Sequence, residues 1–330
     1  MNENLIVSYA PHIRGKDNVQ HTMLDVIIAL MPALLGALYF FGIRSLYITL
    51  TGVASSVFFE YLWCKLAKKA VTTGDLSAAV TGILISYSVP PTIPLYMVVI
   101  ASAFAIIIVK CCFGGLGQNI VNPALAARAF MLASWPVEMT NYTAPFDKLG
   151  LFTDIASSAQ NTTSGATPLA FLKGVEGASA ASYTDLFFGH IGGCIGEVSA
   201  FLLIIGGIYL VARKVITLTI PLTYILSVGV FGFIFGGESL LQGDFLYHIL
   251  AGGVIMAGIF MATDYTTSPV SKCGQFIFAL GAGFITGVIR VFGGYPEGVT
   301  YAIMLMNITV PLIDKHIIPR TFGYGREAAK

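Results

Sequence analysis

The residues best suited to chemistry lie in three polar motifs that interrupt long apolar stretches. FGGLGQNIVNPALAAR occupies residues 113–128, NTTSGATPL occupies 161–169, and FMATDYTTSP occupies 260–269. The sequence contains no phosphate-binding loop, serine nucleophile elbow, zinc-protease helix or dinucleotide fingerprint. The motifs therefore predict binding of a ligand or an ion rather than a hydrolytic reaction.

The first motif combines glycines with two asparagines. Gly114, Gly115 and Gly117 allow the backbone to approach a ligand closely. Asn119 and Asn122 are three residues apart, so a helix would place them on one face. The start of that helix would offer free N–H groups and a positive dipole end. The pattern favours a cofactor or substrate with carbonyl groups. The alternative is that the asparagines hydrogen-bond between helices.

The second motif offers an uncrowded hydroxyl. Ser164, Gly165 and Ala166 are small, so they leave Thr167 accessible. An accessible threonine is a possible acceptor for covalent modification. Judged from the residues alone, the stretch equally fits a surface loop without chemistry.

Acidic residues mark the third motif and several apolar stretches. Asp264 is flanked by threonines and a serine, whose oxygens suit a cation, although a carboxylate also satisfies the backbone at a helix end. Asp25, Glu60, Glu197 and Asp314 lie in or next to apolar stretches, where a carboxylate is costly and suggests function. Glu60 and Glu197 are the stronger candidates, because Asp25 and Asp314 fall near the expected headgroup region.

The elements that position these motifs must be apolar helices. The 330 residues are 56% hydrophobic and 11% charged, with a mean hydropathy of +0.80, whereas ordinary globular chains carry roughly 25% charged residues. This composition argues against a soluble enzyme, a nucleic-acid binder and a disordered scaffold. The net charge of +1 indicates no anionic partner. Five cysteines show no metal-ligand spacing, and the polar N-terminus lacks the apolar core of a signal peptide. We expect an integral membrane protein.

Ten apolar stretches approach the roughly 20 residues that cross a bilayer as a helix. They are residues 22–43, 45–64, 76–92, 95–111, 119–135, 191–212, 216–236, 245–263, 275–292 and 298–313. Pro90, Pro91 and Pro94 must end the third helix. The fifth holds Pro123 and Arg128, so we expect it to pack inside the bundle. The sequence thus predicts an all-α polytopic membrane protein.

Basic residues predict the orientation of these stretches. With the N-terminus in the cytoplasm, one basic residue, Arg128, falls within a span. Four fall outside: Arg44, Lys148, Lys173 and Arg290. Thirteen fall inside: Arg14, Lys16, Lys65, Lys68, Lys69, Lys110, Arg213, Lys214, Lys272, Lys315, Arg320, Arg326 and Lys330. Both termini are therefore expected in the cytoplasm and the long polar stretch near the middle outside it.

The two halves of the chain echo each other. Gly74-Asp75 and Gly243-Asp244 each open a helix, and VKCCFGG at 109–115 resembles VIRVFGG at 288–294. Five spans in each half would give the copies opposite orientations, the inverted-repeat plan of transporters. The predicted organisation is a cytoplasmic segment 1–21, membrane repeat 22–135, extracytoplasmic loop 136–190, membrane repeat 191–313 and cytoplasmic tail 314–330.

Taken together, these motifs resemble the family formed by the D subunit of the Rnf electron-transport (ion-translocating oxidoreductase) complex and its sister, the B subunit of the sodium-translocating NADH:quinone oxidoreductase. The matching pieces, in family order, are FGGLGQNIVNPALAAR, SGAT, HIGGCIGEVSA, FMATDYTTSP and FGGYPEGVTYAIMLMN. The resemblance implies a fold similar to urea transporters, with about ten transmembrane helices as two inverted five-helix repeats. It also implies a bacterial cytoplasmic (inner) membrane location.

The resemblance further implies two flavins. In the family, FMN is joined through its phosphate to the last threonine of a motif that here reads Ser164, Gly165, Ala166 and Thr167. Asn161 stands where that motif has an aspartate. A non-covalent riboflavin is associated with the asparagine pair that corresponds to Asn119 and Asn122. The acids matching the family's ion pathway are Glu60, Asp264 and Asp314.

The function implied is electron transfer between flavins, coupled to outward transport of Na⁺ or H⁺. Ferredoxin would be oxidised and NAD⁺ reduced elsewhere in the complex, so this chain would contribute no catalytic side chain and no metal site and would not be active alone. The implied partners are the A, B, C, E and G subunits of the Rnf complex, a flavin transferase and membrane lipid, but no nucleic acid.

Other functions fit part of the same pattern. The B subunit of the quinone reductase would do similar work with quinone as the electron acceptor. A urea-like solute channel would share the fold without carrying flavin, and a membrane anchor for redox partners would need neither flavin nor pore.

Overall fold

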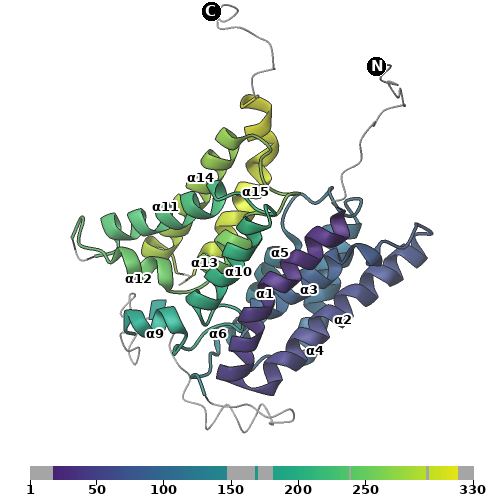
Figure 1. Ribbon diagram of the computed structural model, residues 1–330, viewed down its shortest axis with the longest axis horizontal. Helices are drawn as coiled ribbons and strands as arrows, with labels where there is room; N and C mark the ends of the chain where they lie inside the picture. The colour runs from purple at the N-terminus through teal and green to yellow at the C-terminus, as the bar shows by residue number, and fades with distance from the viewer. Residues whose placement is uncertain (1–17, 147–167, 170–180, 238, 295–296, 319–330) are drawn as a thin grey trace, which may run out of the picture.

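The computed structural model describes residues 18–146, 168–169, 181–237, 239–294 and 297–318. Within these residues every regular element is a helix, and no strand occurs. Figure 1 shows the helices gathered into one bundle. The predicted all-α class is confirmed.

The helices of the first half precede residue 147. They are α1 (Val19–Phe41), α2 (Ile43–Leu66), a 3₁₀ turn (Thr73–Asp75), α3 (Ser77–Tyr87), α4 (Leu95–Ala103) continued by a π-helix (Phe104–Cys111), α5 (Pro123–Ser134) and α6 (Pro136–Thr140). The helices of the second half follow residue 180. They are α9 (Tyr183–Phe188), α10 (Ala200–Ala212), α11 (Thr219–Phe235), α12 (Phe245–Leu250), α13 (Val254–Met256) continued by a π-helix (Ala257–Met261), α14 (Lys272–Phe292) and α15 (Val299–His316).

Each of the ten predicted apolar stretches contains helix, but the helices differ in length and apolarity. By length and composition, α1 and α14 could each cross a membrane, with window hydropathies of 2.1 and 1.7. The shorter apolar helices include α3, α5, α10 and α11. The number of ten crossings therefore stays a prediction.

Several predicted spans are broken, for reasons that the sequence contains. α3 ends at Tyr87, ahead of Pro90 and Pro91. The stretch 245–263 is interrupted between α12 and α13, where Gly252 has a φ of +71°, a conformation that favours glycine. The stretch 191–212 becomes helical only at Ala200, so the residues before it form a loop in the interior.

The fifth predicted span begins later than expected, which corrects the first motif. α5 starts at Pro123, and Asn122 is its N-cap. Gly114, Gly115 and Gly117 have φ values between +89° and +123°, which keeps the stretch before the helix as a loop. Asn119 therefore lies outside the helix and shares no helix face with Asn122.

Close backbone contact holds the first half together. A Cβ atom on Gly82 of α3 would lie 2.4 Å from the carbonyl oxygen of Gly52 on α2. Only glycine permits these two helices to approach so closely, as small residues do at helix interfaces in membranes.

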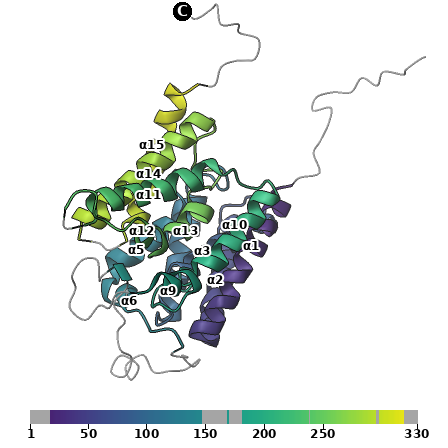
Figure 2. The ribbon, with the colours of Figure 1, turned by 60° about the vertical axis from the view of Figure 1, so that its left-hand side comes forward.

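The two halves share a pattern of helix pairing. α2 packs against α3 and α4, and α11 packs against α12 and α14. Across the halves α1 packs against α10, as Figure 2 also shows, and α5 packs against α15. The pairing agrees with a repeat, but the inverted relation and the likeness to urea transporters stay predictions.

Two arginines that the count assigned to the outer side are buried. The Arg44 guanidinium donates to the Pro91 carbonyl (2.8 Å), just beyond the end of α3. The Arg290 guanidinium donates to the His248 (2.7 Å) and Ala251 (3.1 Å) carbonyls at the end of α12. Each places a positive charge where a broken helix exposes carbonyl groups, which favours cations. Burial does not test the side of the membrane to which the count assigned these arginines, so that assignment stays a prediction.

Candidate functional site

A partly open cavity of about 90 Å³ lies where the two halves meet, beside the start of α5. Its polar lining includes Lys110, Asn119, Asn122 and Asp264. Apolar side chains from both halves complete the wall, among them Leu84, Leu116, Leu210, Ile259 and Phe260. The cavity thus joins residues from the first and third sequence motifs, which lie far apart in the chain.

The two asparagines at this cavity have different surroundings. The Asn119 side chain is 8% exposed, and its Oδ1 is buried without a hydrogen-bond partner. Asn122 Oδ1 accepts from the Ala124 N–H (2.9 Å), and its Nδ2 donates to the Met261 carbonyl (3.2 Å). Asn122 therefore fixes the start of α5, whereas Asn119 presents an acceptor that lacks a donor.

A third asparagine ties α15 to the same end of α5. With its amide oriented to satisfy its neighbours, Asn307 donates to the Thr267 carbonyl (3.1 Å) and accepts from the Asn122 N–H (3.2 Å). The loop that carries Asp264 and the start of α5 are therefore held against one another by α15.

Behind the cavity wall lies a buried ion pair that the sequence did not predict. Lys110 Nζ lies 2.7 Å from Glu60 Oε1 and donates to Ser77 Oγ at 2.6 Å. Both charged side chains are 2% exposed, and Glu60 Oε2 has no hydrogen-bond partner. The Thr72 hydroxyl, near the surface, donates to Glu60 Oε1 at 3.0 Å. The charge of Lys110 is therefore compensated by Glu60 inside the bundle, and its assignment to the cytoplasmic side stays a prediction.

The other predicted acids lie in different surroundings. Asp264 accepts from the Thr266 N–H and hydroxyl (3.2 and 3.0 Å) and from the Thr267 hydroxyl (3.3 Å), while also lining the cavity. Thr263 donates to the Ile259 carbonyl instead. Asp314 is partly exposed on α15 and accepts from the Val270 N–H at 3.3 Å. The structure therefore brings Asp264 to the cavity and leaves Asp314 apart.

Asp25, considered an interfacial acid, also has partners. It accepts from the Tyr209 hydroxyl at 2.8 Å and pairs with Arg213 at 3.3 Å, joining α1 to α10. Its place in the structure is a contact between helices.

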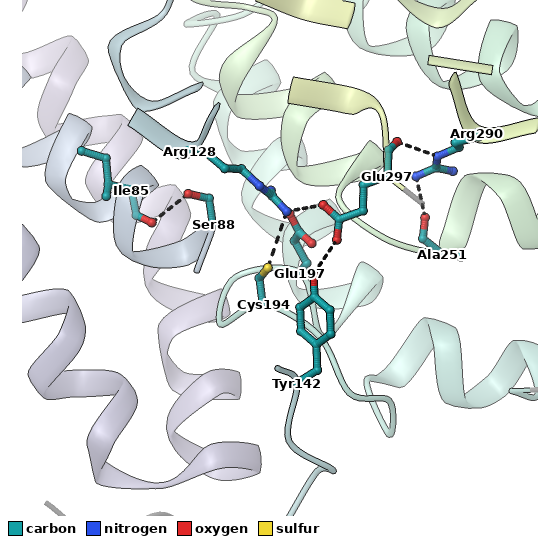
Figure 3. Close-up of polar contacts among 9 residues, drawn as sticks. All are labelled: Ile85, Ser88, Arg128, Tyr142, Cys194, Glu197, Ala251, Arg290 and Glu297. Carbon is teal, nitrogen blue, oxygen red and sulfur yellow. Dashed lines mark hydrogen bonds and ion pairs between the residues drawn. The ribbon is translucent and has the colours of Figure 1, made fainter. Parts of the chain in front are cut away.

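A second set of buried charges surrounds Arg128 in the middle of α5, and Figure 3 shows it. Arg128 Nη1 donates to Glu197 Oε1 at 2.6 Å, and Nη2 donates to Glu297 Oε2. The Arg128 and Glu197 side chains are each 4% exposed. The sequence singled out Arg128 and Glu197 as charges within spans but neither paired them nor identified Glu297. We call these three residues the Arg128 cluster.

Neighbouring groups complete the surroundings of the Arg128 cluster. Arg128 Nη2 lies 3.5 Å from Cys194 Sγ, and the Tyr142 hydroxyl donates to Glu297 Oε1 at 3.4 Å. Burial, and next the Glu297 carboxylate, hold the pKa of the Tyr142 hydroxyl well above its usual range. Tyr142 is therefore a neutral donor at physiological pH. Arg290 donates to the Glu297 backbone carbonyl at 3.0 Å, not to its carboxylate.

The motif at 164–167 lies outside the described residues, but its immediate neighbours are placed. The Tyr247 hydroxyl donates to the Pro168 carbonyl at 3.1 Å. Leu169 is 3% exposed and packs with Leu186, Ile191 and Ala251. The chain directly after Thr167 is therefore anchored to the second half, whereas Asn161, Ser164, Gly165, Ala166 and Thr167 themselves stay sequence predictions.

Comparison with known proteins gives consistent matches along nearly the whole chain. Residues 6–323 match the model of the family described as the NQR2, RnfD, RnfE family. The D subunit of the Na(+)-translocating ferredoxin:NAD(+) oxidoreductase complex of Acetobacterium woodii is 48% identical over 326 residues, covering 98% of this chain and 97% of that protein.

Two other relatives match at similar length. The D subunit of the proton-translocating ferredoxin:NAD(+) oxidoreductase complex of Clostridium ljungdahlii is 43% identical, covering 97% of this chain and 96% of that protein. The D subunit of the ion-translocating oxidoreductase complex of Stutzerimonas stutzeri is 37% identical, covering 95% of this chain and 94% of that protein. The matched range therefore spans both halves of the chain.

Proposed function

The chain belongs to the NQR2, RnfD, RnfE family, and we propose that it is the D-type subunit of an ion-translocating ferredoxin:NAD⁺ oxidoreductase complex. The observation that carries this proposal is the 48% identity, over nearly the full length of both chains, to a protein with that name. In this role the chain passes electrons between flavins within the membrane and is active only in the assembled complex. Its partners are the A, B, C, E and G subunits.

A membrane location is supported by the outer surface of the bundle. Long apolar side chains face outward on several helices, including Leu35 on α1 (62% exposed), Ile208 on α10 (63%) and Phe284 on α14 (56%). In water such a surface would be unfavourable, whereas lipid covers it at no cost. We place the protein in the bacterial inner membrane with ten helical segments and both termini in the cytoplasm.

The cavity beside α5 fits one edge of a non-covalent flavin, riboflavin. A buried acceptor without a donor is costly, and Asn119 Oδ1 is such an acceptor at the cavity wall. The imide N–H of a flavin ring would satisfy it, and Asn122 would hold the adjoining helix start in place. When bound, the flavin supplies one- and two-electron transfer, while the protein sets its position and electrostatic surroundings. Because the cavity is partly open, the rest of the ligand would extend beyond it.

A covalent FMN on Thr167 is the second cofactor that we propose. It is supported by the Ser164–Thr167 motif and by the anchoring of Pro168 and Leu169 directly after it. A flavin transferase would attach the FMN through its phosphate, and the anchored neighbours would limit how far the attached group can move.

The ion pathway is proposed to include Glu60, Asp264 and Asp314. Glu60 and Asp264 lie close to the cavity, one behind its wall and one in it. The transported ion is Na⁺ or H⁺. Both kinds of transport are named among the relatives.

The test is intact-mass spectrometry of the chain purified from its native complex. One FMN-sized adduct is expected, and Thr167→Ala should remove it together with the in-gel flavin fluorescence of the denatured chain. Thr162→Ala and Thr163→Ala are matched controls that should keep the adduct, and Asn161→Asp should raise its occupancy or leave it unchanged.

The same preparation separates the competing functions. A chain without any flavin in a complex that is otherwise active would favour a solute channel or a membrane anchor. An adduct that persists in Thr167→Ala would remove that residue as the attachment site. Quinone reduction by the purified complex, in place of NAD⁺ reduction, would identify it as a quinone reductase.

A further inference from the structure

The Arg128 cluster has no role in the electron transfer or the ion pathway proposed above. Its members come from three separate parts of the chain, α5, the loop before α10 and the start of α15 (Figure 3). Arg128 and Glu197 are separated by 69 residues, and Arg128 and Glu297 by 169. Burial of three ionised groups at one point between the two halves is costly, and a cost of this kind within a membrane protein suggests function.

The charges in the cluster are unequal. One guanidinium, that of Arg128, donates to two carboxylates, those of Glu197 and Glu297. A second cation, Arg290, also contacts this region, but its hydrogen bonds go to the backbone carbonyls of Glu297, His248 and Ala251. The two carboxylates therefore share one directly bound positive charge.

The donor atoms around Arg128 would suit a small cation. Ligand atoms of Cys194, Glu197 and Glu297 lie within 4.8 Å of one another, and the neutral Tyr142 hydroxyl lies beside Glu297. Carboxylate and hydroxyl oxygens are hard ligands, which a hard cation prefers. The guanidinium of Arg128 lies among these atoms, in the place that such an ion would take.

Two observations indicate that Arg128 is an imperfect occupant. Its Nε is buried and has no hydrogen-bond partner, although an arginine normally uses its donors in a buried ion pair. In addition, a partly open cavity of about 40 Å³ adjoins the Glu297 carboxylate, and its wall is formed by Leu132, Thr140, Tyr142, Glu297, Gly298, Thr300 and Tyr301. The cavity gives an ion the size of a water molecule an approach to the Glu297 carboxylate.

We propose that the carboxylates of Glu197 and Glu297 form a small-cation site that the Arg128 guanidinium occupies in this conformation. In the exchange one positive charge leaves the carboxylates as the guanidinium moves away, and one positive charge enters as Na⁺ or a proton, so the net charge of the site is unchanged. Arg128 thereby closes the contact between the two halves until a cation replaces it. The proposal uses neither flavin, so its failure would leave the flavin sites intact.

The test compares the purified complex carrying Arg128→Gln with the wild type and with Arg128→Gln/Glu197→Gln. Melting temperature is measured while Na⁺ replaces choline at constant ionic strength, and in a separate series across pH at fixed Na⁺. Arg128→Gln should melt lower than the wild type without Na⁺ and regain stability as the ion fills the site. The expected rise is about 3 °C at ten times the dissociation constant, whereas the wild type and the double variant should show no comparable rise.

The two series distinguish the ions. A melting temperature that rises with Na⁺ identifies a sodium site. A melting temperature that rises only on acidification identifies a proton site, and the groups that could bind the proton are Tyr142, Cys194, Glu197 and Glu297. The proposal would be overturned if the melting temperature of the Arg128→Gln complex depended on Na⁺ and on pH no more strongly than that of the wild type.

A second variant covers the case in which Arg128→Gln does not assemble. Glu297→Gln leaves Arg128 and Glu197 as a one-to-one pair that a cation should displace poorly. If the ion is Na⁺, we expect the half-saturating Na⁺ concentration for turnover to shift at least tenfold. If the ion is a proton, we expect the pH midpoint of turnover to shift by about one unit. Reduced stability with both values unchanged would show that the cluster is only a structural contact.

Discussion

The two ends of the α5–α15 pair use buried polar groups in opposite ways. Where α5 begins, Asn307 from α15 holds Asn122, and a partly open cavity leaves Asn119 Oδ1 without a partner. Where α15 begins, Arg128 from α5 holds Glu297, and the charged groups fill the space between the helices. At each end, a side chain from the middle of one helix contacts the start of the other.

The difference shows how one helix arrangement can carry two kinds of site. Amide groups at the start of α5 satisfy the backbone without adding charge, which leaves room and one free acceptor for a neutral ligand. Opposite charges beside the start of α15 occupy most of the space between the helices and leave a cavity of about 40 Å³ next to Glu297. A cation could compete with the Arg128 guanidinium there. Both ends place polar groups at broken helices, which in membranes are tolerated only inside a bundle or at a cavity.

The two ends of the α5–α15 pair are expected to face opposite compartments. Val137 is 75% exposed near the α15 start, and Leu66 is 72% exposed at the end of α2. On intact cells an impermeant thiol reagent should label Val137→Cys and leave Leu66→Cys unlabelled, as judged by peptide mass spectrometry. The exposed native Cys112 and Cys273 serve as internal controls that should react only after permeabilisation. Their labelling on intact cells would invert the predicted topology.

Removing one partner of a buried ion pair should give the next largest effect, which is a loss of stability. Lys110→Met should lower stability by about 3–5 kcal/mol, because it leaves the Glu60 carboxylate buried without its cation. Lys110→Met/Glu60→Leu should recover most of that loss, since both buried charges are removed together.

The same double replacement at the other end should recover less. Arg128→Met/Glu197→Leu leaves the Glu297 carboxylate without its directly bound cation. Melting temperatures of the purified complexes at low Na⁺ would measure both cycles. Equal recovery at the two ends would mean that Glu297 contributes no unbalanced charge.

Part of this architecture could be predicted from the sequence. The helical stretches, the end of α3 before Pro90 and the burial of Arg128 all followed from apolar length, proline and the cost of charge in lipid. The start of α5 could also have been predicted, because Asn122-Pro123 combines a preferred N-cap residue with a preferred first helical residue. The helix was instead extended back to Asn119 by its apolar neighbours.

The partners of the buried charges could not be predicted. A charge within a span indicates that it has a partner or a cavity, but the identity of the partner depends on how distant segments pack. Lys110 and Glu60 are 50 residues apart, and Arg128 and Glu297 are 169 residues apart. Lys110 could be counted only as a basic residue near the end of an apolar stretch, because nothing near it in the sequence indicates the acid that lies opposite it in the bundle.

A smaller effect separates the two asparagines at the cavity. Asn119→Ala should reduce riboflavin affinity about ten- to a hundredfold, the cost of roughly 1–3 kcal/mol for one lost hydrogen bond. The melting temperature of the flavin-free protein should not change, because Asn119 caps no helix, whereas the flavin-bound protein loses part of the stability that the bound ligand supplies. Asn122→Ala should instead cost about 1 kcal/mol of stability, because α5 loses its N-cap. Asn122→Asp keeps the capping acceptor and is the matched control. Riboflavin content and melting temperature measure the two effects, and flavin retained in Asn119→Ala would return that residue to a structural role.

The smallest expected effect concerns Asp264, which shares the cavity with the asparagines but already has three local donors. Asp264→Asn keeps the size of the side chain and removes its charge, while one amide oxygen still accepts from the Thr266 segment. We therefore expect normal flavin content and nearly normal stability. The half-saturating ion concentration for turnover of the assembled complex should rise about three- to tenfold, because the cavity loses a negative charge.

Asp314→Asn is the matched control, since that carboxylate is partly exposed and lies outside the cavity lining. Its half-saturating ion concentration should change by less than about twofold, because exposed charges are screened. Equal shifts in the two variants would indicate a general effect of charge at this end of the molecule rather than an ion step at the cavity, and no shift in either would leave Asp264 as a carboxylate that only organises its own turn.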